Sequence, residues 1–118
     1  MSTWASQSSY FANTKTLTND AKHSATALRD VSMSSASLRT VCAVLDLQTE
    51  EVNAALPTPD NQATNLLSKA LDDLGAGAVQ CYGAASNGAK RAKALRNLTS
   101  GVGYLAEATA RVANVATP

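Results

Sequence analysis

Aromatic side chains are scarce in this chain of 118 residues: they make up 4% of it, although 45% of the residues are hydrophobic. Much of the hydrophobic share is alanine, so a core here is built from Leu, Val and Ala side chains. Each such contact buries little apolar area, and helices therefore have to pack closely to stabilise the fold. A chain of this length forms one domain with a modest core. We expect a single helical domain over residues 1–118.

The chain also has no large excess of positive or negative residues, because its net charge is +1 at pH 7. So small a net charge gives no long-range field that would attract nucleic acid or an anionic membrane. No stretch approaches the ~20 apolar residues that span a bilayer. We therefore expect neither nucleic-acid binding nor a membrane span.

The N-terminus, Met1-Ser2-Thr3-Trp4-Ala5, has no basic segment and no apolar segment, so we do not expect it to be a signal peptide. An export signal that had been removed and replaced by a start methionine would leave the same N-terminus. An extracytoplasmic or secreted location and a cytoplasmic one therefore both stay open at this point.

Apolar residues recur at helical spacing in four segments. The four expected helices run from Ser2 or Thr3 to about Val31, from Ser34 or Ser35 to Leu56, from Thr58-Pro59 to Cys81, and from beyond Gly88 to Val112. Thr58 is the expected cap of the third helix, with Pro59 at its first position and Asp60 in its first turn. The tail, Ala113 to Pro118, is expected to fray.

Four amphipathic segments joined by short turns predict an all-α fold, an antiparallel up-down four-helix bundle. The alternative is a three-helix bundle in which the first two segments form one long bent helix. No sheet is expected, because no useful length alternates with a period of two. Gly75 and Gly77 weaken the third helix, but small residues there let a neighbouring backbone approach closely.

Cys42 and Cys81 each lie on the apolar stripe of their segment. Their even number and their core-facing positions favour a disulfide; the alternative is two buried free cysteines in a cytosolic protein. A hairpin that turns near residue 58 leaves the two cysteines seven residues out of register, which is about 10 Å at a rise of ~1.5 Å per residue. A non-helical stretch from Pro57 to Gln62, or a crossing of the helices, has to absorb this mismatch.

His23 is the only histidine, and it stands next to Lys22. The sequence has neither the Glu-x-x-His pairs of di-iron bundles nor a Cys-x-x-Cys-His haem motif. We therefore expect a surface histidine, with no metal and no cofactor. One histidine and no nucleophile-elbow pattern give no hydrolase site, and we expect no enzyme.

Three of the five aromatic residues, Trp4, Tyr10 and Phe11, lie within the first eleven positions. One interpretation is that they plug one end of the bundle, where Ala-rich helices leave room. The other is that, together with Tyr104, they form an aromatic surface for a partner or line a small apolar pocket.

A second candidate surface is the one basic cluster of the sequence, Lys90, Arg91, Lys93 and Arg96. Nucleic-acid binding calls for a broader basic face with aromatic rings to stack. A solvated helix surface is the better interpretation, with Asp72 and Asp73 or Glu50 and Glu51 as candidate salt-bridge partners.

The order of the motifs resembles a family of small, all-helical, two-cysteine actinobacterial proteins of unassigned function, often exported or membrane-anchored. The residues that carry the resemblance are Trp4, Asp20, Ala27-Leu28, Leu38-Arg39-Thr40-Val41-Cys42, Leu56-Pro57-Thr58-Pro59-Asp60, Ala70-Leu71-Asp72-Asp73-Leu74, Cys81 and Leu105-Ala106-Glu107-Ala108-Thr109. The resemblance implies a helical bundle, an interhelical disulfide and an extracytoplasmic setting. It implies no catalytic residues.

These observations lead to two hypotheses about function. The first is a non-enzymatic interaction or structural module that binds a protein partner in the cell envelope. The second is a small-ligand-binding or sensory bundle with an apolar pocket near Tyr10, Phe11 and Tyr104. The sequence identifies neither the partner nor the oligomeric state.

Overall fold

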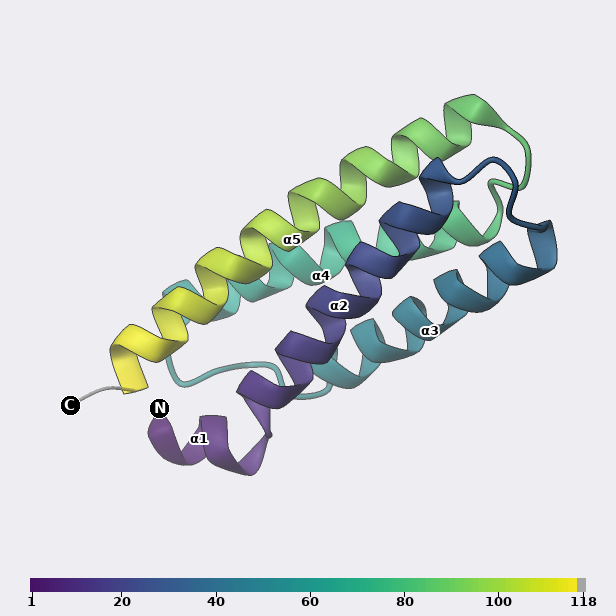
Figure 1. Ribbon diagram of the computed structural model, residues 1–118. Coiled ribbons are helices and arrows are strands. Elements are labelled where there is room, and N and C mark those ends of the chain that lie inside the picture. The colour runs from purple at the N-terminus through teal and green to yellow at the C-terminus, as the bar shows by residue number, and fades with distance from the viewer. Residues whose placement is uncertain (117–118) are drawn as a thin grey trace.

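The computed structural model describes residues 1–116, which fold into five helices without a strand in that range (Figure 1). The helices are α1 (Ser2–Gln7), α2 (Tyr10–Arg29), α3 (Ser35–Asn53), α4 (Asn61–Tyr82) and α5 (Gly88–Ala116). The predicted all-helical fold is thus confirmed.

The four long helices lie along the length of the molecule and form a helical bundle 48 Å long and 20 by 17 Å across (Figure 1). α4 packs against both α3 and α5, and α2 packs against the same two helices. The short helix α1 lies at one end, in contact with α2 and α5. α2 and α3 are separate helices joined by a turn at residues 30–34, so they do not form one long bent helix.

The chain breaks the predicted first helix into α1 and α2, which corrects that prediction. Ser9 has φ of 53°, a left-handed conformation that interrupts a helix of L-residues. The apolar stripe that the sequence predicts from Tyr10 to Val31 is confirmed as far as Leu28, since Tyr10, Leu17 and Leu28 are all buried. Its last member, Val31, was wrongly placed, because it lies beyond the end of α2 and is exposed. The first turns of the expected helix have instead become a separate element at the end of the bundle.

Side chains cap the N-termini of α3 and α4. Ser34 caps α3, as predicted, by accepting a hydrogen bond from the backbone N–H of Ser37 at 3.1 Å. At α4 the prediction was wrong, because Asp60 is the cap and accepts from the N–H of Ala63 at 2.9 Å. Pro59 therefore lies outside the helix.

Residues 54–60 form a connector that absorbs the mismatch between the cysteines. Cys42 stands eleven residues before the end of α3 and Cys81 stands twenty residues after the start of α4. At a rise of ~1.5 Å per residue, the difference between these two lengths is about 13 Å, and the connector has to span it along the bundle. Figure 1 shows it running from the end of α3 toward the end of the bundle where α1 lies. Thr58 holds it by hydrogen bonds to Asp60 and Thr64.

α5 differs from its prediction at both its buried face and its end. Ala92, expected in the core, is exposed, whereas Ala94 and Gly101 are buried. Residues 113–116, expected to fray, continue the helix, and the hydroxyl of Ser2 donates to the carbonyl of Ala116 at 2.7 Å. The last two residues of the predicted tail lie outside the described residues.

α4 and α5 approach each other through a reciprocal pair of glycines. A Cβ placed on Gly77 would lie 2.6 Å from Leu98 Cδ2, and one on Gly101 would lie 2.6 Å from Leu74 Cγ. Each leucine thus fills the space that the opposite glycine leaves. Gly103 lies on the same helix as Gly101, but a Cβ there would meet nothing within 4 Å.

Gly101 and Gly103 on α5 provide a matched test of this contact. We expect Gly101→Ala to destabilise the protein by about 1–3 kcal/mol, because the new methyl group overlaps Leu74. Gly103→Ala is expected to stabilise it by about 0.5–1 kcal/mol, since alanine is the better helix former where space is open. Urea unfolding of the two variants and the parent measures both changes; equal effects of the two substitutions would contradict the close α4–α5 contact.

Candidate functional site

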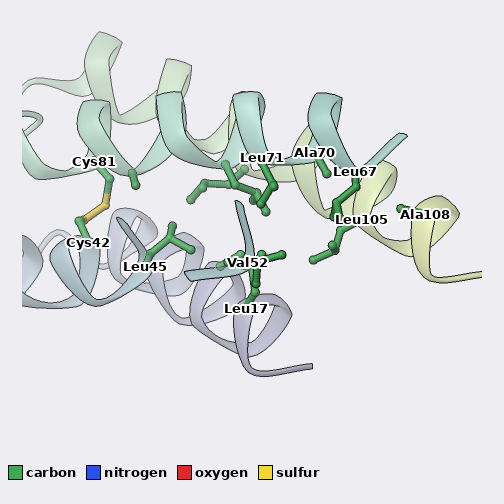
Figure 2. Close-up of a cluster of buried hydrophobic side chains, with 14 of the residues drawn as sticks. Leu17, Cys42, Leu45, Val52, Leu67, Ala70, Leu71, Cys81, Leu105 and Ala108 are labelled. Carbon is green, nitrogen blue, oxygen red and sulfur yellow. A yellow bond between two sulfur atoms is a disulfide. The ribbon is translucent and has the colours of Figure 1, made fainter. Parts of the chain in front are cut away.

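The predicted cysteine pair is present, since Cys42 and Cys81 lie at disulfide distance with their Cα atoms 5.7 Å apart. Both residues are fully buried. Figure 2 shows the sulfur–sulfur bond joining α3 to α4 at one end of a row of leucine and alanine side chains. The pair therefore connects two helices of the bundle and belongs to the core.

The aromatic residues near the N-terminus are packed together, as the interpretation of a plug expects. Tyr10 is 1% exposed, and the ring centroids of Trp4 and Tyr10 are 5.2 Å apart. The indole Nε1–H of Trp4 donates to the carbonyl of Ala55 in the connector at 3.2 Å. The hydroxyl of Tyr10 lies 3.2 Å from that of Thr109, and burial raises the pKa of the phenol. Phe11 is the exposed member of the group, at 44%.

Tyr104 lies elsewhere, against α4. The ammonium group of Lys69 is 5.7 Å from the centroid of its ring. Tyr104 also lines an open surface hollow of about 310 Å³ together with Thr99, Ser100 and Glu107. The structure thus brings Trp4, Tyr10 and Phe11 together and places Tyr104 apart from them, in a different surface.

The predicted basic cluster divides into one structural residue and three exposed ones. Arg91 donates through Nε to the carbonyl of Ala85 at 2.6 Å and through Nη1 to that of Leu28 at 3.0 Å. It therefore ties the end of α2 to the turn before α5. Lys90, Lys93 and Arg96 are exposed at the start of α5.

The salt bridges suggested for this cluster are not formed within residues 1–116. Asp73 accepts a hydrogen bond from the hydroxyl of Ser100 at 2.7 Å instead. Within residues 1–116, the ion pair that is formed joins Asp60 and Arg111. Two bonds connect them, from Arg111 Nε to Asp60 Oδ2 at 2.9 Å and from Nη2 to Oδ1 at 3.0 Å. This bidentate contact holds the pKa of Asp60 at about 2.

His23 is exposed on α2, where it borders a hollow between α2 and α3. The hollow has a volume of about 350 Å³, and its apolar wall includes Met33, Val41 and Val44. Asp20 also lines it. Within the described residues, no three His, Cys, Asp or Glu side chains are grouped so as to hold a metal ion.

A second hollow follows the other side of α3, between α3 and α4. Its first part has a volume of about 410 Å³ and lies directly over Cys42; Leu47, Val79 and Tyr82 line it and are 66%, 66% and 52% exposed. Its second part, of about 300 Å³, continues along the same two helices and is lined by Glu50 and Asp72 among others. Because Asp46 borders both parts, we treat them as one feature, the α3–α4 groove.

Sequence reasoning missed this groove, although a signal for it was present. The sequence predicts an apolar stripe on this helix that includes Leu38, Leu45 and Val52, and α3 buries all three on its inner face. Leu47, which lines the groove, falls outside that stripe, so α3 carries an apolar residue on a second face. A helix with a second apolar face is expected to contact something besides its own core.

Comparison of the chain with protein-family models, with curated proteins and with solved structures gave no match. Across residues 1–116, no helix is both long and apolar enough to cross a membrane.

The cysteine pair is tested by mass spectrometry of protein purified without reductant. In denaturant we expect neither thiol to react with an alkylating reagent until a reductant is added, after which both react. Denaturant is required because both residues are buried in the folded protein. Cys42→Ala/Cys81→Ala is expected to lower the free energy of unfolding by about 3.5–4 kcal/mol, from the entropy of a closed loop of this length. Ready alkylation of both thiols without reductant would refute the disulfide.

The Asp60–Arg111 ion pair is tested by the pH dependence of stability. Since the pKa of Asp60 in the folded protein, about 2, lies below the unfolded value, the ionised carboxylate stabilises the fold above pH ~4. That stabilisation is lost as the pH falls through about 2. We expect Asp60→Asn, which keeps a capping oxygen, to be less stable than the parent near neutral pH and to approach it near pH 2. Urea unfolding at several pH values measures this; a difference that does not change with pH would contradict it.

Proposed function

We propose that this protein is a non-enzymatic interaction module that binds a protein partner through the outer surface of α3 and α4. The observation that carries the proposal is the group of exposed apolar side chains that line the groove between these two helices, Leu47, Val79 and Tyr82. Contiguous apolar surface of this kind is typical of contact sites, because leaving it in water costs free energy that burial against a partner recovers.

The proposal includes an extracytoplasmic location and the antiparallel up-down arrangement of α2, α3, α4 and α5. A cysteine pair at disulfide distance fits an oxidising environment, since thiols stay reduced in the cytosol. The packing of α4 against α3 and α5, and of α2 against the same helices, fits a four-helix bundle. The actinobacterial resemblance points the same way and adds the setting of the cell envelope.

A second candidate function is the binding of a small apolar ligand in the hollow between α2 and α3. Its volume of about 350 Å³ lies within the range of small-molecule sites, and Met33, Val41 and Val44 give it an apolar wall. This hollow, at the other side of α3, replaces the pocket first expected near Tyr10, Phe11 and Tyr104.

Site-specific photo-crosslinking in the cells that produce the protein tests the proposed function. A benzophenone amino acid in place of Leu47 is expected to give a discrete protein adduct. The same group in place of Ala106, exposed on α5 away from α3, is the matched control and should give none. Adding Val79→Asp should remove the adduct, because a charge then stands in the apolar contact. Equal adducts from both positions, or no protein adduct from Leu47, would refute partner binding at this surface.

A further inference from the structure

The two halves of the α3–α4 groove differ in chemistry. The half over the cysteine pair is apolar, with Leu47, Val79 and Tyr82 in its walls. The half farther along α3 is acidic, with Glu50 and Asp72 in its walls. One turn of α3 separates Leu47 from Glu50. A molecule lying in the groove would therefore meet an apolar surface first and negative charge one turn further on.

The carboxylates of this groove are not neutralised by the chain itself. Asp46, Glu50 and Asp72 form no ion pair or side-chain hydrogen bond within residues 1–116, and no lysine or arginine lines either half. Asp60 differs, since Arg111 neutralises it. The groove thus presents a negative potential that favours a cationic occupant.

The walls of the groove also restrict the backbone of the occupant. Both walls are helices, and their backbone N–H and C=O groups are already hydrogen-bonded within α3 and α4. They offer no free ladder to an extended strand, so an occupant has to satisfy its own backbone hydrogen bonds. A helix does this, and helices commonly bind in apolar grooves through side chains at i, i+3, i+4 and i+7.

We propose that the α3–α4 groove binds a cationic amphipathic helix of a partner protein. Apolar side chains of that helix pack on Leu47, Val79 and Tyr82, and its lysines or arginines lie one to two turns further along, beside Glu50 and Asp72. This inference rests on the proposed function, since it names the chemistry of the partner at the same surface.

A second copy of the chain fits the groove less well than a cationic helix does. Pairing of two such faces would bring six carboxylates into one interface, three from each copy, without a cation from either groove lining. Like charges placed in one interface disfavour association. A cationic helix instead places positive charge beside the carboxylates of Glu50 and Asp72.

The test uses two synthetic helical peptides of about 15 residues, long enough for four turns. Each has leucines on one face and arginines on the following turn, with the arginines at the C-terminal end in one and at the N-terminal end in the other. A scrambled peptide of the same composition is the control for attraction by charge alone. Binding to the full chain is measured by fluorescence anisotropy of the labelled peptides, and the contact surface by NMR shifts of backbone amides.

We expect one patterned peptide to bind, with shifts confined to the walls of the groove, and the scrambled peptide to bind much more weakly. Asp46→Asn/Glu50→Gln/Asp72→Asn should weaken binding about tenfold, which corresponds to about 0.5 kcal/mol per exposed ion pair. Glu107→Gln, an exposed carboxylate on α5, should leave binding unchanged. Leu47→Ser should weaken it about tenfold or more, and Phe11→Ser should not.

Three results would overturn the inference. They are binding of patterned and scrambled peptides with equal affinity, binding that the triple variant does not change, and sedimentation of the protein as a dimer that Leu47→Asp dissociates. An adduct from photo-crosslinking at Leu47 together with failure of both patterned peptides would reject the cationic helix and leave the proposed function intact. If Leu47 gives no photo-crosslinked adduct and neither patterned peptide binds, both proposals are rejected.

Discussion

The contact of Cys42 on α3 with Cys81 on α4 fixes the register between these two helices, and much of the structure depends on that register. It places α3 against the C-terminal part of α4. The first turns of α4 then extend beyond α3, and the connector 54–60 has to cover the difference. α1 lies at this end against α2 and α5, and its Trp4 donates a hydrogen bond to the connector. The register set by this cross-link thus accounts for the length of the connector, which Trp4 of α1 contacts.

The same alignment creates the surface to which we assign a function. Because α3 and α4 run side by side from the cysteine pair onward, their outer residues form one groove. Small residues keep it open: Ala43 and Ala78 line its apolar half, and Gly75 lines its acidic half. On the other side of α4 the helix–helix distance is set by glycine, where Gly77 receives Leu98 and Gly101 receives Leu74. In a core with few aromatic rings, such close approaches supply contact that large side chains provide elsewhere.

Much of the fold could be predicted from the sequence because its signals are local. The stripe of Leu17 and Leu28 and the cap at Ser34 each depend on residues within a few positions. The end of α3 was predicted less closely, since the helix stops at Asn53 and not at Leu56. The predictions failed where a distant residue decides the local structure. Asp60 caps α4 while Arg111, from the far end of the chain, holds its carboxylate, and Thr58 is occupied within the connector. On α5 the burial of Gly101 likewise depends on a distant residue, because its missing side chain leaves the space in which Leu74 of α4 packs.

The sequence by itself determined the helical class, the number of long amphipathic segments and the presence of two core-facing cysteines, since periodicity and capping are properties of neighbouring residues. Only the tertiary structure decided the groove. Leu47 and Val79 are 32 positions apart in the sequence, and although Leu47 lies outside the buried stripe of α3, nothing local to α3 pairs it with Val79. They become one surface because the cysteine pair fixes the register between α3 and α4, and register between helices depends on contacts that no local pattern contains.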